Sequence, residues 1–276
     1  MHRSLMRQLA GAGLLLLCSA TVARAQLRPI HPMEWNLFDD HRTVTSRIGA
    51  SLFEHQRASL AGTEGELWEL GDFSVAVRSG RVAVELAGTA LRIFEDQEVF
   101  ADPFGGARES TGKRRRDAGD IRVSTMVLLT PPDREAAAML RFGTRLPTTD
   151  NEVGLERDRT DFFALLGGRL KHGPYFLSGE TGVGINGTHD PRFEQSDVLM
   201  YSATAAYKGK WLSPRLSLVG HMDGMHGWTI RGNEELSELR LGARAGRRIW
   251  VEVEGVYGLQ TFSPRSGVML FAGIAY

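Results

Sequence analysis

The chain has 276 residues, enough for one large domain or two small ones, and it carries 33 basic and 33 acidic side chains. This even balance of charge argues against a nucleic acid as the partner. Cys18 is the only cysteine and lies in a segment that we expect to be removed, which excludes disulfides, a cysteine metal site and a cysteine nucleophile from the mature chain.

Residues 1–25 have the pattern of a secretory signal peptide. Arg3 and Arg7 precede an apolar run over residues 9–18, and Ala23-Arg24-Ala25 matches an A-x-A cleavage site. We therefore expect a mature chain that begins at residue 26 and has a formal charge of −3, because the removed segment holds three arginines and no acid. A lipoprotein anchored through Cys18 is disfavoured, because the preceding Leu17 is too large for a lipobox.

Residues 26–40 are irregular and contain two prolines, so they form either a periplasmic tail or a short plug. From residue 41 to residue 276 the sequence alternates apolar and polar side chains with the period of two that is typical of strands. Residues 198–208, for example, set Leu199, Tyr201 and Ala203 against Ser202 and Thr204. Twelve segments of this kind follow one another, at residues 43–55, 67–78, 81–94, 120–129, 134–146, 161–171, 175–187, 198–208, 215–223, 235–246, 249–261 and 266–276.

The connections between these segments alternate in length. Short turns are expected at residues 79–80, 131–133, 171–174, 209–214 and 246–248. Longer polar segments are expected between them, at residues 55–66, 96–119, 147–160, 188–197 and 224–234. Outer-membrane barrels have short periplasmic turns and long external loops, so the pattern predicts an all-β, transmembrane, antiparallel up-and-down β-barrel of about twelve strands over residues 41–276.

The last strand ends on an aromatic residue, which is unusual for a soluble domain because chain ends usually fray into water. Counting back from the terminus in steps of two gives one continuous apolar face, made of Tyr276, Ile274, Ala272, Leu270 and Val268. This ending resembles the C-terminal signature of bacterial outer-membrane barrels. The resemblance implies that these five residues are an assembly signal for the barrel-assembly machinery.

Several aromatic residues fall at the strand ends that we expect to be periplasmic. A membrane-interface girdle predicts such a cluster, and its expected members are Tyr175, Tyr207, Trp211 and Tyr276. Trp250 lies at the same level but has inward parity, so either the strand slips there or Trp250 is not part of the girdle.

The inward faces carry many charges, which we expect to line the lumen. The candidates for pore-lining residues are Arg47, Arg78, Glu85, Arg122, Arg141, Arg145, Arg169, Glu180, Arg240, Arg244, Glu252 and Glu254. Unpaired ions are costly in a narrow lumen of low dielectric constant, so one interpretation is a network of ion pairs that holds the barrel open. The other is a transverse field that sorts solutes, and the two are compatible.

Other motifs give little support for chemistry. His221 and Asp223 share a strand face, with His226 in the following loop, but nothing nearby completes the three or four ligands of a zinc site. No nucleophile–histidine pattern of an outer-membrane lipase or deacylase is present, so we expect no catalytic residues, no metal and no cofactor. The basic run at residues 113–116 either contacts lipopolysaccharide phosphates or is simply solvated.

Part of the chain resembles a known family. Residues 119–123 read GDIRV, residues 140–147 read LRFGTRLP, and Gly154-Leu155 and residues 159–162 (RTDF) follow. These runs are similar to those of the outer-membrane proteins of the meta-pathway phenol-degradation group, although Thr148 and Glu156 stand where that group commonly has glycine. The resemblance implies a β-barrel that passes small organic molecules.

These observations lead to one main functional hypothesis and two alternatives. The first is a monomeric outer-membrane barrel, in a Gram-negative-type envelope, that acts as a passive channel or transporter for a small solute. The second is a structural or surface-interaction barrel with a closed lumen, and the third is a membrane-embedded lipid hydrolase. The expected partners are outer-membrane lipid and lipopolysaccharide, the barrel-assembly machinery and the solute, with no nucleic acid.

Overall fold

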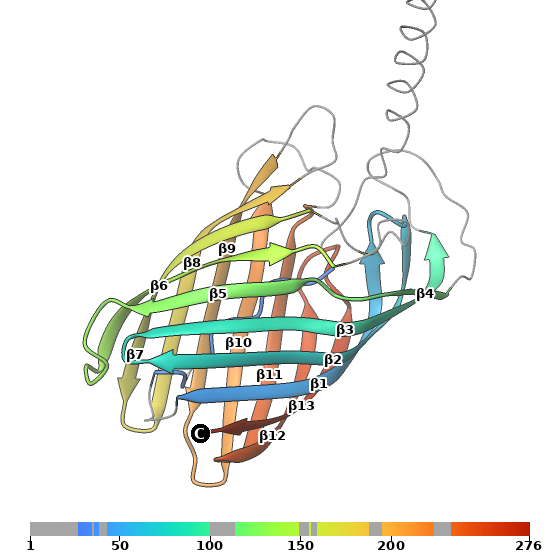
Figure 1. Ribbon diagram of the computed structural model, residues 1–276. Helices are drawn as coiled ribbons and strands as arrows, with labels where there is room; N and C mark the ends of the chain where they lie inside the picture. The colour runs from blue at the N-terminus through green and yellow to red at the C-terminus, as the bar shows by residue number, and fades with distance from the viewer. Residues whose placement is uncertain are drawn as a thin grey trace, which may run out of the picture.

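The computed structural model describes residues 27–34, 36–38, 43–99, 114–148, 155, 159–187, 195–223 and 233–276 (Figure 1). The signal peptide expected at residues 1–25 lies outside these ranges. No helix in the described part of the chain is long and apolar enough to cross a membrane.

The described residues form thirteen strands in a single antiparallel sheet. In chain order they are β1 (Val44–Ala58), β2 (Thr63–Ser79), β3 (Val82–Val99), β4 (Arg114–Asp117), β5 (Ile121–Leu128), β6 (Ala136–Leu146), β7 (Asp161–His172), β8 (Tyr175–Gly187), β9 (Gln195–Tyr207), β10 (Leu212–Asp223), β11 (Leu236–Gly246), β12 (Ile249–Gly258) and β13 (Ser266–Ala275).

Twelve of these strands close into a barrel, with each strand hydrogen-bonded to its neighbours in sequence and β1 paired to β13. Pairing of β2 with β3 and of β3 with β5 completes the circuit, while the short β4 lies outside it on the far half of β3. At the seam the Tyr276 amide donates to the Val44 carbonyl at 2.9 Å. The predicted all-β barrel of twelve strands is therefore confirmed.

Alternation along the strands separates an apolar outside from a charged inside. In β12, Ile249, Val251 and Val253 are 71%, 59% and 48% exposed, whereas Glu252 and Glu254, which alternate with the valines, are almost fully buried. A side-chain period of two places these two sets on opposite faces of the barrel wall. Exposed apolar side chains on most of the strands together give the barrel a hydrophobic outer surface.

Some strand limits differ from those predicted. The expected loop at residues 55–66 is wrong, because β1 and β2 continue as a long hairpin and leave only residues 59–62 as the connection. The turn expected to end at Pro214 is also wrong, since β10 begins at Leu212 and pairs Pro214 with Ala243. The strand tolerates a proline there because pairing with β9 starts only at Arg215, so no ladder bond needs a Pro214 amide.

The expected long loop over residues 96–119 is likewise partly strand. β3 continues to Val99, and β4 pairs with its outer half, so that Arg115 lies opposite Phe94. Figure 1 shows β4 beside the ends of β1–β3 that reach beyond the rest of the barrel wall.

Large aromatic side chains inside the barrel lie over glycines on the neighbouring strand. Each glycine is the direct cross-strand partner of its aromatic residue, and a Cβ atom added to it would overlap the ring. The pairs are Gly49 with Phe271, Gly267 with Phe53, Gly273 with Trp250, and Gly143 with Phe163. The glycines thus provide the room that lets bulky rings fit inside a narrow lumen.

We predict that Gly273→Ala destabilises the barrel. The new methyl group would overlap the Trp250 ring and approach the Ser46 carbonyl oxygen, and relief of such overpacking typically costs about 1–3 kcal/mol. The free energy of unfolding in urea, measured in lipid vesicles, should fall by that amount. Gly255→Ala is the matched control, because its only neighbour, the Leu241 oxygen at 3.8 Å, is an ordinary contact; equal effects of the two changes would contradict the prediction.

Candidate functional site: a charged lumen and the segment inside it

The structure buries most of the charged residues that were predicted to line the lumen. Eight of the twelve are buried, namely Arg141, Arg145, Arg169, Glu180, Arg240, Arg244, Glu252 and Glu254. The other four, Arg47, Arg78, Glu85 and Arg122, are half-buried. Their role in lining a pore stays a prediction. Their position on the inner face follows from the alternation of side chains along the strands.

A segment from before the first strand lies among these charges. We call residues 27–34 and 36–38 the lumen segment. Its ends are buried, with Leu27 fully enclosed and Phe38 3% exposed. Leu27 packs with Phe53 and Trp250 from the barrel wall, and Phe38 packs with Met126 and Met139.

Arg28 fixes the first part of the lumen segment. Its Nη1 lies 2.8 Å from Glu238 Oε1 of β11, and its guanidinium stacks 3.5 Å from the centre of the Phe53 ring on β1. Burial lowers the pKa of Arg28 to about 10, although Glu238 opposes that shift. Arg28 is still charged at neutral pH, so it holds the segment to the wall as an ion pair.

His31 contacts residues from opposite sides of the barrel. Arg240 Nη1 donates to His31 Nδ1 at 2.9 Å, which leaves the proton on Nε2, 3.4 Å from a carboxylate oxygen of Asp72. Arg141 Nη1 donates to the His31 carbonyl oxygen at 3.0 Å. Burial, together with the positive charges of Arg240, Arg47 and Arg122, holds the pKa of His31 well below 6.5. His31 is therefore neutral at pH 7.

Glu34 completes the attachment. Arg244 Nη2 donates to Glu34 at 2.9 Å, while Nε of the same arginine donates to Glu252 at 2.6 Å. Burial alone would raise the pKa of Glu34, but the attraction of Arg244 and Arg215 outweighs it and lowers the pKa to about 2. The segment thus adds a carboxylate to a cluster in which Arg215 also bonds both Glu252 and Glu254.

A similar bridge forms on the opposite wall. The Met33 amide donates to Glu180 at 3.3 Å, and Arg141 Nη1 donates to the same carboxylate at 3.0 Å. Arg141 also approaches Glu85 at 3.4 Å. Arg141 thus links the carboxylates of β3 and β8, and the backbone of the lumen segment bonds to Arg141 and Glu180.

Sequence reasoning missed part of this site. Arg28, His31 and Glu34 were not among the predicted residues, because an irregular segment has no parity that would show which way its side chains point. Glu69 and Arg92, an ion pair at 2.7 Å between β2 and β3, were also missed. Both residues lie within the strands that we expected, but the inward parity changes near Gly71 in β2 and near Ala90 in β3, so alternation alone would have placed them on the outer face.

Other predicted residues occupy the positions expected of them, although their roles are untested. Tyr175, Tyr207, Trp211 and Tyr276 are all exposed, and the first two rings pack edge to face at 5.3 Å between centroids. Trp250 is buried, and the pairing of β12 with β13 runs without a register shift, so Trp250 is not part of an exposed girdle. The outward face of β13 is exposed at Val268, Leu270, Ala272 and Tyr276 and half-exposed at Ile274.

The remaining motifs show ordinary contacts. His221 is buried, and its Nε2 lies 2.9 Å from the Glu234 carbonyl oxygen. His226 and Lys113 lie outside the described residues. Within the described ranges, no three His, Cys, Asp or Glu residues gather in a way that could hold a metal ion. Arg115 of the basic run forms an ion pair with Asp96 at 3.0 Å.

Comparisons with known proteins support the fold. No family model matches the sequence, and no match was found among curated proteins. Among solved structures, an outer membrane channel from Pseudomonas putida F1 superposes with a TM-score of 0.60 at 11% identity, covering 90% of this chain and 100% of that one. The NanC porin superposes with a TM-score of 0.52 at 8% identity, covering 84% and 98% of the two chains. At these identities the likeness shows a shared outer-membrane-type barrel fold.

We predict that acid weakens the attachment of the lumen segment. The pKa of His31 is lower when the segment is bound, so the released segment takes up a proton more readily as the pH falls below about 6.5. The pKa of Glu34 is about 2 when bound against 4.5 normally, so its contribution is complete above pH 4.5 and is lost between there and pH 2. Both pKa values are lowered when the segment is bound, so protonation of either group favours release. The charged groups that face His31 from the barrel wall are Asp72, Glu254, Arg47, Arg122 and Arg240.

Hydrogen–deuterium exchange, corrected for the intrinsic rate at each pH, measures this attachment. The amides of Ile30, His31, Met33 and Glu34 should lose protection at pH 4 relative to pH 7, whereas amides in the middle of β12 should not. Unchanged protection of residues 30–34 at pH 4 would show that the two groups do not control the attachment.

Proposed function

We propose that this chain is an outer-membrane β-barrel that passively conducts a small solute, along a path that the lumen segment narrows. The observation that carries the proposal is the combination of an apolar outer surface with inward strand faces that bury many charged side chains. A soluble barrel of this size would bury its apolar faces instead. The two structures described above are also named as a channel and a porin.

The arrangement of charge supports a selective path. Arg215, Arg240 and Arg244 on β10 and β11 face carboxylates of β11 and β12, and Arg141 faces Glu85 and Glu180 on the opposite wall. Fixed charges around a narrow path sort solutes by charge and dipole, as they do in pores. Nothing in this arrangement needs covalent chemistry, so we propose a channel and not an enzyme.

Sequence features support the location and the class of solute. The signal-peptide pattern at residues 1–25 and the aromatic end of the chain at Tyr276 are those of an exported barrel inserted by the assembly machinery. The resemblance to the meta-pathway phenol-degradation group favours small organic molecules. We also propose lipopolysaccharide as a neighbour of the external loops.

A second candidate function is a closed barrel that acts through its surface. The lumen segment favours this second function, because the segment and the wall charges bound to it fill most of the interior. Two cavities beside the segment leave space of only about 50 and 30 Å³, enough for a few water molecules each. A solute larger than that would need the segment to shift.

Planar-bilayer recording distinguishes the two candidates. We expect stepwise ohmic conductance from the mature protein, and a severalfold larger conductance from a variant that keeps the signal peptide but lacks residues 27–38. The increase follows because the segment occupies much of the cross-section of the lumen. Silence of both proteins, at normal folded yield on an unboiled gel, would overturn the channel and favour the closed barrel.

A further inference from the structure

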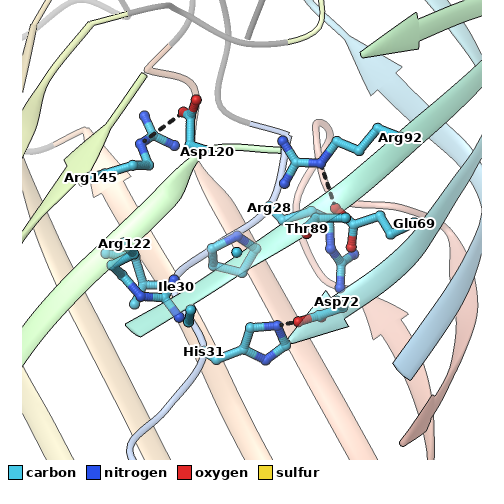
Figure 2. A pocket seen from close by; sticks show the side chains of 13 residues that line it. Arg28, Ile30, His31, Glu69, Asp72, Thr89, Arg92, Asp120, Arg122 and Arg145 are labelled. Carbon is cyan, nitrogen blue, oxygen red and sulfur yellow. Dashed lines mark hydrogen bonds and ion pairs between the residues drawn. The ribbon is translucent and has the colours of Figure 1, made fainter. Parts of the chain in front are cut away.

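The larger of these two cavities lies beside an irregularity in the pairing along β3, between the β5 and β4 ladders. β3 pairs with β5 only as far as Ala87 and Arg122, and beyond that point the Gly119 amide bonds to the Thr89 carbonyl oxygen. The cavity opens between this edge and the lumen segment, so that Ile30 and His31 form one side of it (Figure 2). Its lining is mostly polar and includes four arginines, Arg28, Arg92, Arg122 and Arg145.

Three of the four arginines are held by carboxylates. Arg28 pairs with Glu238 at 2.8 Å, Arg92 with Glu69 at 2.7 Å, and Arg145 with both Asp120 and Asp161. Asp72, the remaining acid of the lining, lies against His31 at 3.4 Å. The acids of the cavity wall are therefore already engaged.

Arg122 is different. Figure 2 shows it reaching toward Ile30 and His31 with no interaction drawn to it. Its Nε atom is shielded from solvent and has no hydrogen-bond partner among the described residues, and no carboxylate within that part of the chain lies in ion-pair contact with its guanidinium. Glu85 is its strongest electrostatic partner, but that carboxylate lies 3.4 Å from Arg141 and accepts from Ser124.

A comparison with the other inward arginines shows how unusual this is. Arg47 also has no ion pair among the described residues, but its guanidinium stacks on the Phe271 ring at 4.5 Å. Among the described residues, Arg122 has neither a ring nor a carboxylate in contact. Arg122 is half-buried, but a shielded N–H group such as its Nε costs free energy when it has no acceptor, so a ligand that supplies the missing acceptor would be bound favourably.

The chemistry of the wall restricts that ligand. A guanidinium fork matches the two oxygens of a carboxylate, which can accept two parallel hydrogen bonds. The cavity has room for a group of a few heavy atoms, with the rest of the molecule extending into the lumen. Glu69, Asp72 and Asp120 around the cavity would repel a second negative charge, which disfavours a phosphate dianion.

We propose that the Arg122 cavity is a binding site for the carboxylate group of a small monovalent organic acid. The site would define the class of solute that the proposed channel carries. It rests on the proposed function only for the route by which the solute reaches it. Binding to Arg122 itself does not require conduction. The bound carboxylate would lie between β5 and the lumen segment, beside His31.

Isothermal titration of the purified mature protein with sodium acetate tests the site, in a buffer that contains no other carboxylate. The wild-type protein should bind acetate saturably, and at least tenfold more tightly than phosphate. Arg122→Gln should weaken binding tenfold or more. Arg57→Gln, the same loss of charge in the β1–β2 hairpin where Arg57 pairs with Glu64, should change it less than twofold.

A second variant controls for misfolding of Arg122→Gln. Ala87→Leu keeps every charge but fills the cavity, and it should also weaken acetate binding at least tenfold. No saturable binding by wild type, equal binding by Arg122→Gln, or tighter binding of phosphate would each overturn the site. If the wild-type protein conducts but does not bind acetate, only the acetate site is overturned. If it binds acetate but never conducts, only the channel is overturned.

Discussion

The structure depends on the pairing of buried charges inside the barrel. Transfer of a single guanidinium or carboxylate from water into a narrow protein interior costs several kcal/mol, and the loss is recovered only when a partner with good geometry is in place. The barrel wall does not supply every partner itself. Glu34 of the lumen segment binds Arg244, and Arg28 of the segment binds Glu238, so the wall and the segment neutralise each other.

This dependence connects the fold to the proposed function. Because ion pairs and hydrogen bonds bind the segment in addition to its apolar ends, its attachment responds to pH and to other charged molecules, whereas a purely apolar plug would not. Large rings such as Phe271 and Trp250 pack over glycines and keep the wall rigid around it. Arg122, an inward arginine that contacts neither a carboxylate nor a ring among the described residues, then marks where a solute can take part in the same network.

The sequence predicted the wall well and its contents poorly. Period-two alternation is a local signal, so it placed Glu252 and Glu254 inside and Val251 and Val253 outside, and the inward parity of Trp250 proved correct. Which arginine meets which carboxylate depends on the register and closure of the whole sheet, and no local pattern carries it. The irregular residues 27–38 have no period at all, so the sequence could not choose between a periplasmic tail and a short plug, and the roles of Arg28 and His31 could not be predicted.

The pairing of Glu34 with Arg244 tests the central claim most directly. A double-mutant cycle with Glu34→Gln and Arg244→Gln measures their coupling through the free energy of unfolding, and it cancels the other contacts of Arg244 with Glu252 and Trp250. For a buried, charge-assisted bond at 2.9 Å we predict a coupling of about 1.5–3 kcal/mol. Additive effects, with a coupling below about 0.5 kcal/mol, would show that the segment and the wall do not depend on each other.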